Sequence, residues 1–99
     1  MKINALLMDE KDNVVTCVAD VAKGEQVVYR CGEEICSLTA EEDIPFCHKI
    51  ALTDLKEGDE VIKYGELIGR TSRQIVRGTW ISHNNIYSVP RDYDSEFIS

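Results

Sequence analysis

The expected fold follows from the run Val21-Ala22-Lys23-Gly24-Glu25-Gln26-Val27. It contains an aliphatic residue, two variable residues, a glycine, two variable residues and a β-branched residue. The pattern returns as Leu55-Lys56-Glu57-Gly58-Asp59-Glu60-Val61 and as Ile75-Val76-Arg77-Gly78-Thr79-Trp80-Ile81. A glycine that ends a turn commonly adopts positive φ, and a β-branched residue favours a strand. We therefore expect each copy to be one helical turn that ends at its glycine and leads directly into a strand.

An acidic residue stands before two of these copies. Asp20 and Asp54 are placed to accept a hydrogen bond from a free N–H at the start of the turn that follows. The third copy has Gln74 at this position, which is a weaker cap.

The chain between the copies predicts short strands. Expected strands cover residues 3–8, 14–18, 26–30, 35–38, 61–64, 67–68 and 80–83. Residues 31–34 and 63–66 are interpreted as tight turns between strands, and residues 71–77 as one or two helical turns. The fold class is thus mostly β with short helical turns, in one domain over residues 1–87, followed by a C-terminal tail over residues 88–99.

Composition excludes several classes of function. The 99 residues are 43% hydrophobic and 29% charged, which is typical of one globular domain. A formal net charge of −7 argues against general binding to a phosphate backbone or an anionic lipid surface. No apolar run approaches the roughly 20 residues that cross a bilayer, and the N-terminus lacks signal-peptide features, so we expect a cytoplasmic protein.

The two histidines provide the first candidates for chemistry. Neither His48 nor His83 has a second histidine at metal-ligand spacing, and the Cys31/Cys36 pair lacks a second pair, so we expect no metal site made by this chain alone. His48 is the candidate catalytic residue, because a cation at Lys49 favours a neutral imidazole that can act as a base. Adjacent strand residues point to opposite faces, so the two meet one ligand only from a turn or loop.

Other polar residues are candidates for binding substrate. Lys49 and Lys63 are expected to meet an anion, Tyr64 to donate a hydrogen bond, and Asn84 to contact a polar ligand. Without a ligand, the same residues would be a solvated hairpin tip and turn residues.

The residues just discussed resemble the SAF domain of altronate and galactarate dehydratases. The similarity covers about residues 3–86 and rests on short motifs read together. These are Asp12-Asn13-Val14, Asp43-Ile44-Pro45-Phe46-Cys47-His48-Lys49-Ile50-Ala51, Val61-Ile62-Lys63-Tyr64-Gly65-Glu66-Leu67-Ile68-Gly69, Ile75-Val76-Arg77-Gly78 and a closing His-Asn.

The resemblance implies a small β-clip fold and a role in a lyase. In this family the domain precedes a large catalytic domain, and in sulfolactate sulfo-lyase it is a separate small subunit. The implied chemistry is elimination of water or sulfite from a hydroxy acid. It uses a divalent metal such as iron or manganese, which the large partner subunit would mainly hold. The implied site residues are His48, Lys49, Lys63, Tyr64 and the His83-Asn84 end.

Two positions depart from the family pattern. The family has glycine before the His-Lys pair, where this chain has Cys47, and this could alter the loop backbone. The family closes on V-H-x-H-N, where this chain has Ile81-Ser82-His83-Asn84-Asn85. With one deletion, which we prefer, His83-Asn84 matches the final His-Asn; without a gap, Asn84 replaces the final histidine and Ser82 the first.

The leading hypothesis is a small subunit of a hydroxy-acid or sugar-acid dehydratase or related lyase, completed by a large subunit. The alternative is a non-catalytic module that binds a carbohydrate or an anion. A third hypothesis is a structural domain that associates with itself through exposed strand edges.

Overall fold

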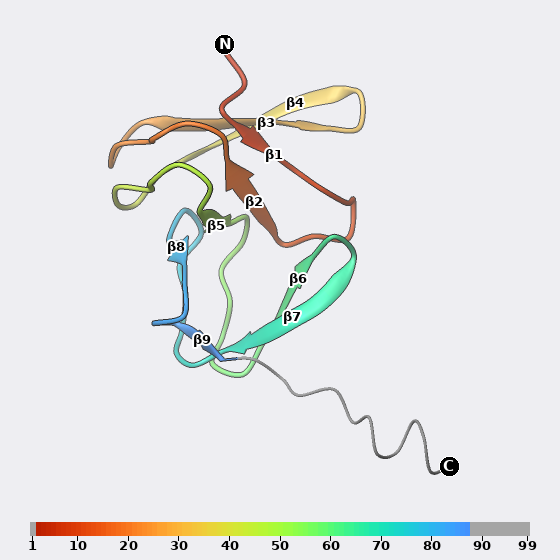
Figure 1. Cartoon of the computed structure of the whole chain (residues 1–99), viewed down its shortest axis with the longest axis vertical. Helices are drawn as coiled ribbons and strands as arrows, with labels where there is room; N and C mark the ends of the chain where they lie inside the picture. The colour runs from red at the N-terminus through yellow and green to blue at the C-terminus, as the bar shows by residue number, and fades with distance from the viewer. Residues whose placement is uncertain (1, 88–99) are drawn as a thin grey trace.

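The chain forms three small antiparallel sheets (Figure 1). The computed structural model describes residues 2–87, and this part of the chain contains strands and turns but no helix. The strands are β1 Ala5–Leu6, β2 Val14–Cys17, β3 Gln26–Cys31, β4 Glu34–Thr39, β5 Lys49–Ala51, β6 Glu60–Lys63, β7 Glu66–Thr71, β8 Trp80–Ile81 and β9 Ile86–Tyr87. The mostly β fold expected from the sequence is confirmed.

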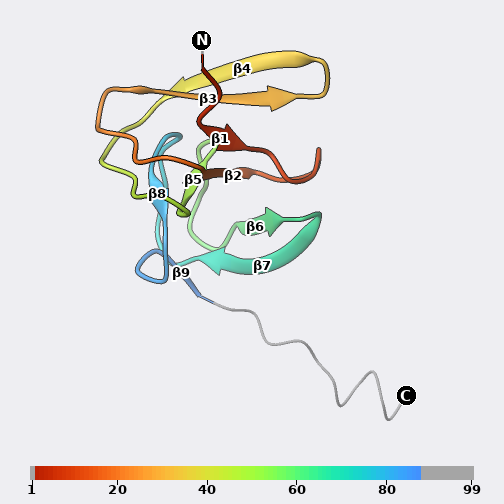
Figure 2. The same cartoon turned by 45° about the horizontal axis from the view of Figure 1, so that its top comes forward.

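A four-stranded sheet in the order β1-β2-β5-β8 lies between two hydrophobic cores. Side chains alternate between the faces of a strand, so Val15 and Ile50 pack into the core beneath the β3–β4 hairpin. Val14 and Ala51 pack into the core shared with β6, β7 and β9. Figure 2 shows the hairpin β3–β4 on one side of this sheet and β6–β7 on the other.

The glycine connectors are β-turns, which corrects the expectation of helical turns. In the first, the N–H of Glu25 donates to the carbonyl of Ala22 at 2.9 Å, and Gly24 has φ +89°. Gly58 (φ +86°) and Gly78 (φ +92°) occupy the same place in the other two copies. A bond from the fourth residue to the first with positive φ at the third is the pattern of a type II turn, which is too short to start a helix. The positive φ itself was predicted correctly.

The structure contains a fourth connector that the sequence pattern did not reveal. Ile44 to Ile50 repeats the same hydrogen bonding, with the N–H of His48 donating to the carbonyl of Pro45 at 3.2 Å. Cys47 stands at the glycine position with φ +71°. The pattern was missed because a search for glycine cannot find it. The backbone at this loop therefore keeps the turn, and His48 follows the turn residue directly.

Replacing Cys47 with glycine is expected to stabilise the fold by about 0.5–1 kcal/mol. A side chain at positive φ costs about 1 kcal/mol, and the gain is reduced by the greater freedom of glycine in the unfolded chain. Urea unfolding of Cys47→Gly measures the effect. Cys47→Ala keeps the Cβ atom and is the control, so an equal gain in both variants would show that strain at this residue is not the cause.

The connectors bind each other in pairs. Asp20 and Asp54 were expected to accept a hydrogen bond from the turn that follows each of them, and this expectation is wrong. Isolated bridges join Val21 to Ile44 and Leu55 to Ile75. The carboxylate of Asp20 accepts a hydrogen bond from the N–H of Phe46, at 2.8 Å, in the paired connector and not in its own. The carboxylate of Asp54 likewise accepts from the N–H of Arg77 at 2.8 Å. These side chains hold two distant turns side by side.

The remaining differences concern short elements. Strands β5 and β9 are not among the expected strands, because two or three residues carry too little periodicity. The expected helical stretch 71–77 is wrong: Thr71 ends β7, Ile75 forms the bridge to Leu55, and no residue between them is helical. The expected tail at residues 88–99 lies outside the described residues.

Within residues 2–87, no helix is long and apolar enough to cross a membrane.

Candidate functional site

Lys49 opens β5 in the middle of the four-stranded sheet. It pairs with Thr16 of β2 on one side and with Ile81 of β8 on the other. Directly opposed residues in antiparallel strands share a face, so the Lys49 side chain lies on the face that carries the second core, towards β6 and β7. The sheet thus places a lysine beside an apolar core, where it is partly buried.

Lys63 and Tyr64 lie at the turn between β6 and β7. Tyr64 (φ +56°) and Gly65 (φ +73°) make a two-residue hairpin turn in which both φ values are positive, as in type I′ turns. The buried carboxylate of Asp12 accepts hydrogen bonds from the N–H groups of Tyr64 and Gly65, at 3.0 and 2.8 Å. The Lys63 ammonium lies 5.3 Å from the centre of the Tyr64 ring. The turn predicted over residues 63–66 is confirmed, and Asp12 fixes it.

Asn13 attaches this hairpin to the central sheet. Its side-chain amide donates to the carbonyl of Glu60 at 2.8 Å, and its side-chain oxygen accepts from the N–H of Ile62 at 2.8 Å. Because Asn13 directly precedes β2, these bonds hold β6 against the strand that pairs with Lys49. Lys49 and Lys63, two residues of the expected site, are thereby brought to one region.

The electrostatic environment of Lys49 includes the charge of Lys63. Partial burial lowers the pKa of the Lys49 ammonium, and the charge of Lys63 lowers it further. The only ion pair among the described residues joins Arg70 to Glu60, so neither lysine has a carboxylate within salt-bridge distance there. The hydroxyl oxygen of Thr16, opposite Lys49, is buried and has no hydrogen-bond partner within residues 2–87. Within residues 2–87, neither ammonium group therefore has an ion-pair partner, and the hydroxyl has no hydrogen-bond partner.

The isolated domain is expected to gain about 0.5 kcal/mol of stability when Lys49 becomes methionine. The gain is small because solvent screens a partly exposed charge. The lowered pKa means that the unfolded chain holds the proton to higher pH than the folded chain. Wild-type stability therefore rises as the pH approaches the ordinary lysine value of 10.5. The stability advantage of Lys49→Met over the wild type should narrow over that range in urea titrations, with Lys11→Met at an exposed lysine as the matched control.

His48 lies on the other face from Lys49. Its Nδ1 accepts a hydrogen bond from the indole Nε1–H of Trp80 at 3.1 Å, and the two rings meet edge to face with centres 4.7 Å apart. Trp80 pairs with Ile50 and packs against the first core, so this contact belongs to the face opposite Lys49. One ligand can reach both His48 and Lys49 only around the end of β5. The sequence did not predict this contact of His48 with Trp80.

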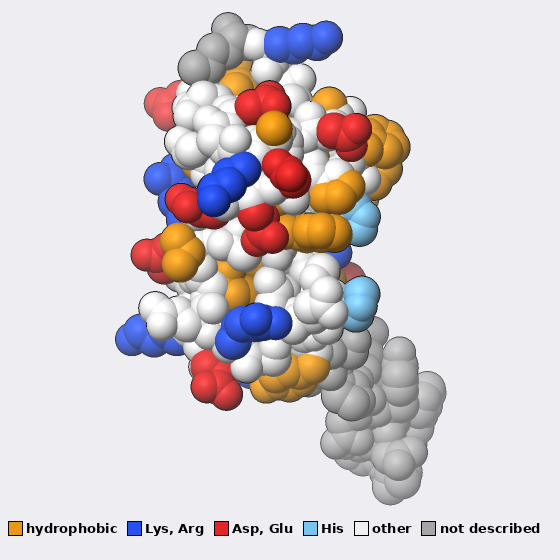
Figure 3. Space-filling model, turned by 90° about the vertical axis from the view of Figure 1, so that its left-hand side faces the viewer, with side chains coloured by type: hydrophobic (Ala, Val, Ile, Leu, Met, Phe, Trp, Pro, Cys, Tyr) orange, Lys and Arg blue, Asp and Glu red, His pale blue; other side chains and the backbone are white. Residues whose placement is uncertain are grey.

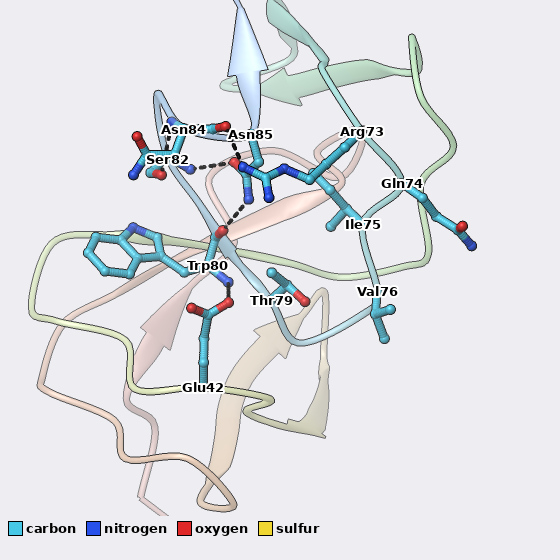
Figure 4. A pocket seen from close by; sticks show the side chains of 10 residues that line it. All are labelled: Glu42, Arg73, Gln74, Ile75, Val76, Thr79, Trp80, Ser82, Asn84 and Asn85. Atoms are coloured by element: carbon cyan, nitrogen blue, oxygen red, sulfur yellow. Dashed lines mark hydrogen bonds between the residues drawn. The ribbon is translucent and has the colours of Figure 1, made fainter.

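A cavity of about 350 Å³ lies beside Trp80 (Figure 4). The polar side chains that line it include Glu42, Arg73 and Asn84. The Arg73 guanidinium donates to the backbone carbonyl of Asn84 at 2.8 Å. Of the predicted substrate-binding residues, Asn84 alone lines this cavity.

Asn85 organises the wall of the same cavity. It is buried, its side-chain oxygen accepts from the N–H of Ser82 at 2.8 Å, and its amide donates to the carbonyl of Trp80 at 2.7 Å. In the ungapped alignment of the closing motif, Asn85 is the residue that matches the final asparagine. His83 is exposed, and both histidines lie along the same edge of the surface in Figure 3.

The described residues do not fit a metal centre of their own. No group of three histidine, cysteine, aspartate or glutamate side chains within residues 2–87 is placed to hold a metal ion. Cys17 is buried, and burial raises the pKa of its thiol to about 11, which disfavours the thiolate that a metal needs. We therefore derive no reaction step through a metal on these residues.

Comparison with known proteins places the chain in a family. The model of the altronate/galactarate dehydratase SAF domain matches residues 3–89. The chain belongs to this family. The resemblance drawn from the motifs is thus confirmed.

Three relatives show the settings in which the domain occurs. The chain is 38% identical to altronate dehydratase of Bacillus subtilis over 76 residues, which are 77% of this chain and 14% of that protein. It is 36% identical to galactarate dehydratase (L-threo-forming) of Escherichia coli over 77 residues, 78% of this chain and 14% of that protein. It is 33% identical over 89 residues to (2R)-sulfolactate sulfo-lyase subunit alpha of Chromohalobacter salexigens, covering 87% of this chain and 95% of that subunit. The chain therefore spans a small part of the dehydratases and nearly all of the lyase subunit.

Proposed function

We propose that this chain is the cytoplasmic small subunit of a hydroxy-acid dehydratase or related lyase, and that a large subunit completes its site. The match over nearly the whole of a lyase alpha subunit supports a separate chain with a partner. The shorter matches to two dehydratases support a sugar acid or other hydroxy acid as substrate.

The paired lysines are the observation that carries this proposal. In a chain with a net charge of −7, the charge of Lys63 lowers the pKa of Lys49, and neither lysine has a carboxylate at salt-bridge distance among the described residues. Like charges held together raise the free energy of the empty site, and a bound carboxylate removes that penalty. The substrate class that fits is therefore an organic acid.

The lysines also suit the chemistry of elimination. Removing the proton next to a carboxylate builds negative charge on the carboxylate oxygens, and fixed cations stabilise that charge. Lys49 and Lys63 would bind the carboxylate and stabilise the charge, and Tyr64 would add a hydrogen bond. The partner subunit would hold the iron or manganese ion and provide the rest of the site. His83 and Asn84, of which Asn84 lines the cavity beside Trp80, are the remaining candidates for binding substrate.

The experiment compares this chain alone with its mixture with a candidate large lyase subunit. Galactarate, altronate and sulfolactate are titrated into each, with glucitol as the uncharged control. We expect co-purification, at least tenfold tighter binding of one acid by the complex, and turnover of that acid. Equal affinity with and without the large chain, and no turnover, would instead favour the second candidate, an anion-binding module without catalytic activity.

A further inference from the structure

The contact between His48 and Trp80 restricts what the imidazole can do. The indole Nε1–H is a donor and has no lone pair to offer, so the Nδ1 atom of His48 at 3.1 Å must be the acceptor. A neutral imidazole carries one proton, and that proton must then lie on Nε2. His48 is exposed, so it presents an N–H group to solvent and not a lone pair.

Trp80 is fixed from several sides, which makes it a dependable donor. Its backbone N–H donates to a carboxylate oxygen of Glu42 at 3.2 Å, and its backbone carbonyl accepts from the side-chain amide of Asn85 at 2.7 Å (Figure 4). Its ring packs against the first core. The backbone of His48 is fixed as well, because its carbonyl accepts from the N–H of Cys17 at 2.9 Å and its N–H closes the turn to Pro45.

We propose that Trp80 is a positioning residue that holds His48 as the Nε2–H tautomer, so that His48 donates a hydrogen bond to a substrate oxygen. This rests on the proposed function for the identity of the ligand, an organic acid. The acceptor is the carboxylate or the departing hydroxyl or sulfonate oxygen, whose negative charge grows during elimination. A neutral N–H stabilises that charge without giving up its proton.

The proposal assigns His48 a role other than general base. A base would need its lone pair on Nε2 and its proton on Nδ1. That proton would then face the indole N–H, and the hydrogen bond between the rings would be replaced by a repulsive contact. Proton abstraction next to the carboxylate therefore falls to a group outside this pair.

Nuclear magnetic resonance of the isolated chain tests the tautomer without any partner or substrate. The chain has one tryptophan, so its single indole N–H signal reports the contact directly. At alkaline pH we expect slow exchange of this proton with water, coupling from Trp80 Nε1–H to His48 Nδ1, and a ¹⁵N pattern of the Nε2–H form. His48→Ala should speed the exchange by about tenfold or more. An indole proton that exchanges equally fast in both proteins, or an Nδ1–H form of His48, would overturn the tautomer assignment.

Activity of the two-chain enzyme tests the donor role. The side-chain amide of glutamine can donate from about the position of Nε2 but cannot act as a base, so His48→Gln should recover at least tenfold of the activity that His48→Ala loses. Trp80→Phe should lower kcat more than it changes KM. If His48→Gln is as inactive as His48→Ala, the donor role is wrong even if the spectra support the tautomer. If His48→Ala has full activity, His48 does not contact the substrate, and the proposal that it donates to a substrate oxygen is wrong. The spectra then still decide the tautomer.

Discussion

Gly78→Ala is expected to lower the free energy of unfolding by about 2–4 kcal/mol. The residue has φ +92°, where a side chain costs about 1 kcal/mol. A Cβ atom there would also collide with the backbone carbonyl of Thr39 and approach the side chain of Glu41 to 3.1 Å. Overpacking of this kind adds about 1–3 kcal/mol, because backbone atoms cannot move aside as a flexible side chain can.

Gly24→Ala is the matched control for this prediction. Gly24 has the same position in its connector and φ +89°, but a Cβ atom there would meet nothing within 4 Å. Its loss should be about 1 kcal/mol, the cost of the backbone conformation alone. Urea unfolding followed by the fluorescence of the single tryptophan measures both variants. Equal losses would show that the contact with Thr39 does not matter.

Converting both lysines to methionine should lower kcat/KM of the two-chain enzyme by about 10²-fold or more. A charge-assisted hydrogen bond to a carboxylate contributes about 1.5–3 kcal/mol, and each of Lys49 and Lys63 would lose one. Steady-state kinetics on the acid that the complex turns over measures the loss.

The same variants also separate function from stability. Lys49→Met is expected to stabilise the isolated domain, so a loss of activity in that variant cannot come from unfolding. Lys11→Met changes an exposed lysine in a turn and should leave kcat/KM unchanged. A double variant with normal kinetics would show that the substrate does not meet the lysine pair.

Repetition in the sequence predicted the parts of the fold that depend on local chemistry. The positive φ of Gly24 and its counterparts followed from the pattern, since a turn that needs this conformation selects glycine. The connector at Cys47 was hidden because a residue with a Cβ atom tolerates the strain there. Asp20 accepts a hydrogen bond from Phe46 of another turn and not from its own turn. This depends on two turns that meet in space, which local sequence does not encode.

The candidate site was only partly accessible to sequence reasoning. Lys49 and Lys63 were each identified by residue type. That the charge of one acts on the other depends on the two hydrogen bonds by which the Asn13 side chain holds β6 against the central sheet. His48 and Lys49 were expected to meet one ligand from a loop, but Lys49 lies in strand β5, so the two side chains point to opposite faces of the sheet. The contact of His48 with Trp80 could not be foreseen, because it joins residues 32 positions apart.

The central claim is that this chain contributes side chains to a lyase site that another chain completes. Turnover of the hydroxy acid by the large chain tests it most directly, measured alone, with this chain, and with its His48→Ala variant. We expect negligible turnover by the large chain alone, full turnover with this chain, and a loss of about 10²-fold with the variant. Full turnover by the large chain without this one, or an unchanged rate with His48→Ala, would contradict the account.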